Sequence, residues 1–218
     1  MADAGSCHLG KRAYAEKLID VGKECGVDVV KFQLFGKAYT EGGNIELPHE
    51  LFKDLYNYGK TIGMPVTASV FDEKALELLI VMDVHHIKLG YSKRKQYGWI
   101  DGALNIGKKV VVTTNIHDAF DLPKHENLIK LITQPRCKHA DEYAIVTKMH
   151  FEGLFDSRFE GFSDHSLGYM ESSLAVSHGA TWIEKHFRLD DEECDRVPDG
   201  RFALTPKQLK EYVWKVRP

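Results

Sequence analysis

Residues 161–187 decide how this chain folds. They open with Gly-Phe-Ser-Asp-His-Ser-Leu-Gly (161–168), continue through an amphipathic run with small residues, and close with Ala-Thr-Trp-Ile-Glu-Lys-His-Phe (180–187). Two strand-like segments flanking a helical one predict a strand–helix–strand crossover, which returns the chain beside its start. His165 and His186 would then lie at the ends of neighbouring parallel strands. Either histidine alone has an ordinary structural alternative, but the pair favours a metal or catalytic role.

The rest of the chain repeats this alternation of apolar β-type runs and amphipathic helical patterns. Further strands are expected at 2–5, 29–34, 65–70, 85–90, 109–114 and 127–133, and helices at 11–25, 48–62, 71–82, 140–155 and 205–216. The connection between 114 and 127 is short for a helix. Eight strands alternating with helices predict an α/β fold, a (β/α)8 TIM barrel. No low-complexity linker interrupts the pattern, so residues 1–218 are expected to form a single domain.

Composition narrows the class of protein. A hydrophobic content of 43% with 28% charged residues is typical of soluble globular proteins, and no apolar run reaches the 18 or so residues of a membrane span. The first residues lack the basic and apolar segments of a signal peptide, so we expect a cytoplasmic protein. The 4 cysteines form no Cys-x-x-Cys pair, which favours reduced thiols over disulfides or structural zinc. A net charge of -3 gives no basic footprint for nucleic acid.

Polar side chains gather at the expected carboxyl ends of the strands, where the sites of such barrels lie. They are Lys31, Gln33, Ser69, Lys88, Thr113, Thr114, Ser163, Asp164, His165, Glu184, Lys185 and His186. Lysines with hydroxyl donors suit an anion that carries phosphate and carboxylate, and two imidazoles suit a divalent metal acting as a Lewis acid. Ser69 and Thr113 could instead be ordinary strand residues, and the lysines could be stems that reach the rim.

These residues resemble the N-acetylneuraminate (sialic acid) synthase family, within the phosphoenolpyruvate-dependent 3-deoxy sugar-acid synthases. The most specific matches are Gly-Phe-Ser-Asp-His-Ser-Leu-Gly and Ile-Glu-Lys-His-Phe. Weaker matches are Ala-Asp-Ala-Gly-Ser-Cys-His-Leu-Gly (2–10), Val-Val-Lys-Phe-Gln (29–33), Ile-Lys-Leu-Gly (87–90) and Asp-Arg-Val-Pro-Asp (195–199). The resemblance covers nearly the whole chain.

The resemblance implies a condensation of phosphoenolpyruvate with the open-chain aldehyde of an N-acylated hexosamine or its phosphate. The products would be a nine-carbon 2-keto acid of the sialic acid type and phosphate. Manganese by family habit, or magnesium or cobalt, would be held by His165 and His186. The resemblance assigns phosphoenolpyruvate to Lys31, Lys88 and Ser163, the sugar to Asp199, and a place near the reacting centre to Asp3. The remaining substrate-binding candidates are Gln33, Ser69, Thr113, Glu184, Lys185 and Arg136.

The chain departs from the family pattern mainly at the sugar end. Tyr-Ser-Lys-Arg-Lys (91–95) replaces the family's Ser-Gly-Glu, the sixth strand lacks the His-Cys-Thr motif, and Asp3 replaces a glutamate. The added cations at the expected barrel mouth are Lys93, Arg94, Lys95, Arg136, Lys138 and His139. They predict an acceptor that carries its own negative charge, with a solvated basic rim as the alternative.

The family usually continues into an antifreeze-protein-like domain that caps the site of the partner subunit. Because the sequence ends after its final helix, we expect a divergent member without this domain, in which a separate polypeptide supplies the cap or the site works open. A homodimer is a further expectation. Two alternative functions stay open: another phosphosugar or aldolase-like barrel enzyme, and a non-catalytic paralogue that binds a sugar or a protein.

Overall fold

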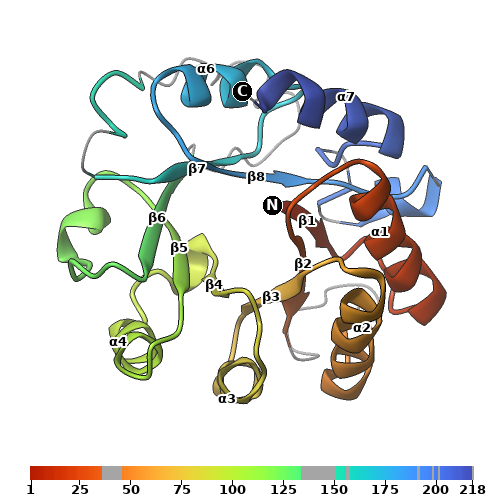
Figure 1. Ribbon diagram of the computed structural model, residues 1–218, viewed down its shortest axis with the longest axis horizontal. Helices are drawn as coiled ribbons and strands as arrows, with labels where there is room; N and C mark the ends of the chain where they lie inside the picture. The colour runs from red at the N-terminus through yellow and green to blue at the C-terminus, as the bar shows by residue number, and fades with distance from the viewer. Residues whose placement is uncertain are drawn as a thin grey trace.

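Eight parallel strands close into one barrel in chain order (Figure 1). The computed structural model describes residues 1–35, 46–133, 151–155, 158–190, 192–197, 199–200 and 202–217. The strands are β1 (Ala2–Gly5), β2 (Val30–Leu34), β3 (Val66–Val70), β4 (Ile87–Leu89), β5 (Val110–Thr114), β6 (Leu128–Thr133), β7 (Gly161–Asp164) and β8 (Trp182–His186). The predicted (β/α)8 fold is confirmed, and every predicted strand is present.

Helices lie around the outside of the barrel (Figure 1). They are α1 (Arg12–Glu24), α2 (His49–Ile62), α3 (Glu73–Val81), α4 (Tyr97–Asn105), α6 (Met170–Ser177) and α7 (Pro206–Val216), with 3-10 turns η2 (Tyr91–Lys93), η3 (Asp118–Asp121) and η4 (Glu192–Arg196). Thr205 and Gln208 form a capping box at the start of α7, and Pro206 occupies its first turn. None of the described helices is long and apolar enough to cross a membrane.

Two connections differ from the expected helix pattern. Helix α4 was not predicted, because Gly98 and Gly102 lower helix propensity; packing of Ile100, Ala103 and Leu104 against the barrel compensates. Residues 140–150 of the predicted helix 140–155 lie outside the described part of the chain, and residues 152–155 form a turn. The short connection after β5 contains only the 3-10 turn η3, as its length implied.

The two faces of the strands bury different side chains. The outer face packs against the helices in a continuous apolar core, as expected for parallel strands covered by helices. Inside the barrel, Val111, Ile129 and Leu131 form an apolar cluster with Met1 and Trp182 near the amino-terminal ends of the strands. Toward the carboxyl-terminal ends the interior becomes polar. The barrel interior therefore has an apolar layer below a charged one. We call the charged space around Asp3, Lys31, Lys88 and Glu184 the chamber.

Candidate active site

The alternation of a β-strand sorts the side chains of β8. Glu184 bonds to residues of β2, β4 and β7 across the barrel interior, whereas Lys185 bonds to residues on the outer, helical side. His186 returns to the inner side, 3.5 Å from a carboxylate oxygen of Asp3 on β1. Successive strand residues point to opposite faces, so the motif Glu-Lys-His delivers only its first and third members to the chamber.

Two lysines and two carboxylates form the centre of the chamber. Lys31 Nζ lies 2.6 Å from Asp3 Oδ2 and 3.2 Å from Glu184 Oε1. Lys88 Nζ lies 3.3 Å from Glu184 Oε2, so Glu184 bridges the two ammonium groups. The side chains of both lysines are only 2% exposed. The alternative that these lysines are stems reaching the rim is therefore wrong.

Hydroxyl groups complete the bonds of this cluster. Lys31 Nζ donates to Ser69 Oγ at 2.8 Å, and Lys88 Nζ donates to Thr113 Oγ1. Ser163 Oγ donates to Glu184 Oε2 at 2.9 Å. Ser69 and Thr113 are thus more than strand-forming residues, because their hydroxyls satisfy buried charges.

The charged groups of the cluster shift one another's pKa values. Burial lowers the pKa of Lys31, but Asp3 and Glu184 outweigh it, so that the net change is upward. For Lys88, burial is the largest influence, and it lowers the pKa although Glu184 raises it. For Glu184, burial is outweighed by Lys88 and Lys31, which hold the pKa of its carboxyl well below the usual range. An ionised Glu184 therefore lies between the two cations.

His165 and His186 meet beside this cluster. Their ring centroids are 5.4 Å apart, and β7 and β8 pair in parallel as predicted. Thr133, at the end of β6, donates its hydroxyl to the Ser163 carbonyl oxygen at 3.0 Å and lies 3.2 Å from His165 Nδ1. Since that hydroxyl proton is engaged, Nδ1 is the donor to Thr133, and Nε2 carries the lone pair. Burial, followed by the charge of His186, lowers the pKa of His165 to about 4, so its ring is neutral.

The two imidazole rings are the candidate ligands of a divalent metal. His186 Nδ1 is buried without a hydrogen-bond partner among the described residues, and such an atom needs a ligand or water. Neutral imidazole nitrogen is a common ligand of first-row metals. Within the described ranges no group of three or more His, Cys, Asp or Glu could hold a metal. With His165 and His186 as its ligands, a metal would keep open positions for substrate.

Asp199 lies over the ends of β1 and β2. Gln33 Nε2 donates to Asp199 Oδ2 at 3.4 Å. Gly5 has a φ of +50, and a Cβ there would lie 2.7 Å from the same oxygen, so only glycine fits beneath Asp199. Asp3 accepts a hydrogen bond from the Gly5 backbone at 2.9 Å. Asp199 therefore faces the chamber from the loop that follows β8.

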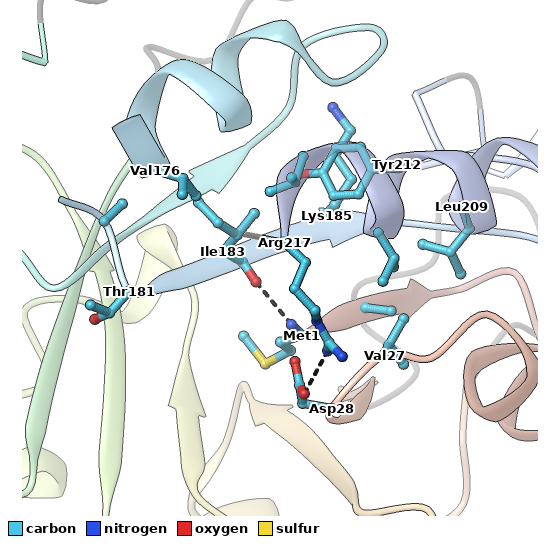
Figure 2. A pocket seen from close by; sticks show the side chains of 14 residues that line it. Met1, Val27, Asp28, Val176, Thr181, Ile183, Lys185, Leu209, Tyr212 and Arg217 are labelled. Atoms are coloured by element: carbon cyan, nitrogen blue, oxygen red, sulfur yellow. Dashed lines mark hydrogen bonds and ion pairs between the residues drawn. The ribbon is translucent and has the colours of Figure 1, made fainter. Parts of the chain in front are cut away.

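The structure separates Lys185 and Asp164, which pair with each other, and Thr114, which alternates with Thr113, from this set. Lys185 lies beside Tyr212 of α7, on the helix-facing side of β8, with its Nζ 5.7 Å from the ring centroid (Figure 2). It does not join the other site residues. Arg136 lies outside the described residues, as do Lys138 and His139. The residues that do come together are Asp3, Lys31, Gln33, Ser69, Lys88, Thr113, Ser163, His165, Glu184, His186 and Asp199.

A second charged cluster occupies the loops after β4 and β5. Arg94 Nε lies 2.5 Å and Lys95 Nζ 2.8 Å from the carboxylate of Asp118. Lys95 and Arg94 hold the pKa of Asp118 well below its usual range. The Arg94 guanidinium stacks 3.9 Å above the ring centroid of Tyr91, whose hydroxyl accepts a hydrogen bond from Asn115 at 2.8 Å. We call Tyr91, Arg94, Lys95, Asn115 and Asp118 the rim cluster.

The sequence prediction missed three residues of these clusters. Thr133, Asn115 and Asp118 orient His165, Tyr91 and Arg94, respectively. Thr133 ends β6, and its position at a strand end was the available signal. Asp118 follows β5 by four residues in Asn-Ile-His-Asp (115–118), where the loops of a barrel face the same mouth as the loop after β4.

Comparison with known proteins agrees with this architecture. The chain is 25% identical over 248 residues to N-acetylneuraminate-9-phosphate synthase of Mus musculus, covering 100% of this chain and 68% of that protein. It is 25% identical over 254 residues to N,N'-diacetyllegionaminic acid synthase of Legionella pneumophila, covering 100% of this chain and 70% of that one. The structure of sialic acid synthetase from Leptospira borgpetersenii shares the fold, with a TM-score of 0.76 and 22% identity over 99% of this chain and 81% of that chain. Residues 37–218 match the NeuB family, and the chain therefore belongs to it.

Proposed function

We propose that this protein condenses phosphoenolpyruvate with an N-acylated hexosamine, or its phosphate, to a nine-carbon 2-keto sugar acid. The observation that carries the proposal is the buried pair Lys31 and Lys88, bridged by Glu184. Beside it lie the neutral ring of His165 and the ring of His186, whose Nδ1 has no hydrogen-bond partner among the described residues. Membership of the NeuB family, with relatives that are synthases of sialic-acid-type sugars, supports the same reaction class.

Phosphoenolpyruvate would bind to Lys31, Lys88 and Ser163. Both ammonium groups already contact three oxygens, and the longest ion-pair contacts are the 3.2 and 3.3 Å distances to Glu184. An incoming phosphate or carboxylate would most readily replace these contacts, since charge-assisted hydrogen bonds are normally shorter. Ser163 would then turn its hydroxyl from Glu184 to the substrate. Glu184 thus keeps the lysines charged and in place until the anion arrives.

The reaction forms one carbon–carbon bond and releases phosphate. The methylene carbon of phosphoenolpyruvate attacks the aldehyde carbon, the aldehyde oxygen takes a proton, and water adds to the phosphate-bearing carbon before phosphate leaves. A divalent metal held by His165 and His186 would polarise the aldehyde. Asp3 contacts both Lys31 and His186, so it lies between the anion and metal ends and can accept the proton of the attacking water.

Asp199 and the rim cluster would meet the acceptor sugar. Asp199 is held over the β1 and β2 ends by Gln33, and a carboxylate there can accept hydrogen bonds from sugar hydroxyls. Arg94 and Lys95 share Asp118, which reduces the positive charge that the rim offers. The comparison of neutral and phosphorylated sugars therefore decides whether the acceptor carries a phosphate. A homodimer and a capping domain stay predictions.

The test is phosphate release from phosphoenolpyruvate by manganese-loaded protein with neutral and phosphorylated N-acylated hexosamines. We expect release that depends on one sugar and is lost in the His165→Ala, His186→Ala double variant. Release without sugar dependence, or release that survives in the double variant, contradicts the proposal. If phosphoenolpyruvate and manganese do not bind at all, the non-catalytic alternative is correct.

A further inference from the structure

A buried ion pair lies behind the active site, on the outer face of the barrel. Lys185 Nζ is 3.1 Å from Asp164 Oδ2, and their side chains are 2% and 0% exposed. Figure 2 shows Lys185 beside Tyr212, on the side of β8 that faces α7. Neither residue touches the chamber, and the reaction proposed above uses neither. A buried ion pair is costly to desolvate and is weak evidence for stability, so its presence calls for another explanation.

The ion pair holds every polar backbone and side-chain group of Ser166. Asp164 Oδ1 accepts from the Ser166 backbone N at 2.8 Å and from Ser166 Oγ at 2.6 Å. Lys185 Nζ donates to the Ser166 carbonyl oxygen. The residue between Asp164 and Ser166 is His165. The backbone on both sides of this histidine is therefore fixed from outside the barrel, while Thr133 orients its ring from inside.

Two further hydroxyls tie the ion pair to the helices. Ser172 of α6 donates to Asp164 Oδ2 at 2.5 Å, and Tyr212 of α7 donates to Ser172 Oγ. The oxygens of the Asp164 carboxylate together take three hydrogen bonds and one ion pair. Because these bonds join β7, β8 and α6, small rotations of the turn would break several of them at once.

We propose that Asp164 and Lys185, with Ser172, are positioning residues that hold the His165 turn in the geometry that binds metal. The inference rests on the metal site of the proposed function. Groups that orient a metal ligand from behind typically change metal affinity by about 10–100-fold when they are replaced. The sequence placed Lys185 in the substrate pocket; the structure gives it this supporting position instead.

The first test is the manganese dissociation constant of the full-length protein, measured by electron paramagnetic resonance. We expect Lys185→Met to weaken manganese binding by about 10-fold or more and Ser172→Ala to weaken it by a smaller factor. Ser177→Ala is the matched control: Ser177 is exposed on the same helix and, among the described residues, bonds only to the Leu174 carbonyl oxygen, so manganese binding should not change. Phosphoenolpyruvate binding without metal should change much less than manganese binding does, because Lys31 and Lys88 lie on other strands and Ser163 alone of its three ligands adjoins the turn.

Lys185→Met leaves the Asp164 carboxylate without its cation and could prevent folding. Ser172→Ala removes a single hydroxyl and therefore carries the test in that case. The proposal is wrong if every folded variant binds manganese as tightly as the unaltered protein does.

Hydrogen exchange of the metal-free protein separates this inference from the proposed function. We expect faster amide exchange in residues 163–168 of Lys185→Met and Ser172→Ala, and no change in Ser177→Ala. If the unaltered protein binds no manganese but the exchange still increases, the metal assignment fails while the positioning role stands. Unchanged exchange in both variants overturns the positioning role itself.

Discussion

The chamber and the rim cluster carry similar charges in opposite settings. In the chamber, Lys31, Lys88 and Glu184 come from strands, and their side chains are 2%, 2% and 5% exposed. At the rim, Arg94, Lys95 and Asp118 come from loops, with 21%, 56% and 13% exposed. An unpaired charge lowers the stability of the fold strongly in the chamber and only slightly at the rim.

This difference explains where the chain keeps the family pattern and where it departs from it. The matched motifs supply Lys31, Lys88, Ser163 and Glu184, whose partners are buried inside the barrel. Residues 91–95 depart from the pattern and lie in a partly exposed loop. Each buried charge on a strand needs its partner for the protein to stay folded. Charges on a loop can be exchanged without this cost, so the loop can vary with the substrate.

The largest expected effect comes from removing the carboxylate that bridges the lysines. Glu184→Gln leaves Lys88 buried without an anion, and we expect a loss of about 3–5 kcal/mol in the free energy of unfolding in urea. Glu193→Gln is the control, because Glu193 pairs with Lys11 at 55% and 51% exposure. Equal destabilisation by the two changes would contradict the contrast between buried and exposed ion pairs.

Burial of His8, in the turn that follows β1, provides a pH-dependent test of what burial does to a charge. Burial lowers the pKa of His8 to about 4 from 6.5. Between these values the unfolded chain takes up a proton that the folded chain does not, so stability falls as pH falls. The contribution is on the order of 3 kcal/mol. His8→Asn keeps an acceptor for the Gly10 N–H and should lose less stability between pH 6.5 and 4; an identical pH profile would argue against the burial effect.

Replacing a chamber lysine should damage catalysis more than any rim change does. For Lys88→Met we expect kcat/KM for phosphoenolpyruvate to fall by about 100-fold, as when one donor to a developing charge is lost. Lys53→Met, in an exposed pair on α2, serves as the control and should retain activity. Steady-state phosphate release measures both, and a fully active Lys88→Met protein would exclude this lysine from the site.

The smallest stability effect is expected at the rim. Arg94→Ala should change the free energy of unfolding by about 1 kcal/mol, because the pair of Arg94 with Asp118 is only partly shielded from solvent and Lys95 still pairs with Asp118. If the acceptor is phosphorylated, the same change should raise the KM of the phosphorylated sugar more than that of the neutral sugar. Equal changes in the two KM values would show that the rim is only a solvated basic surface.

The sequence predicted the strands better than the side-chain orientation. Apolar runs indicate most of the strands, and the motif pair at 161–187 indicates the last two and predicts His165 beside His186. The alternation of β8 implies that Lys185 faces away from Glu184 and His186, whereas the position of all three at one strand end predicts a single site. Asp118 was missed because its partner Arg94 lies 24 residues earlier in another loop, and only the folded barrel brings the two together.

The central claim is that the chamber binds phosphoenolpyruvate and a metal side by side. The most direct measurement is a crystal structure of the protein with manganese and phosphoenolpyruvate, with anomalous scattering to locate the metal. The account predicts a manganese peak shared by His165 and His186, and phosphoenolpyruvate against Lys31 and Lys88. A metal peak away from both histidines, or phosphoenolpyruvate bound outside the lysine pair, would contradict it.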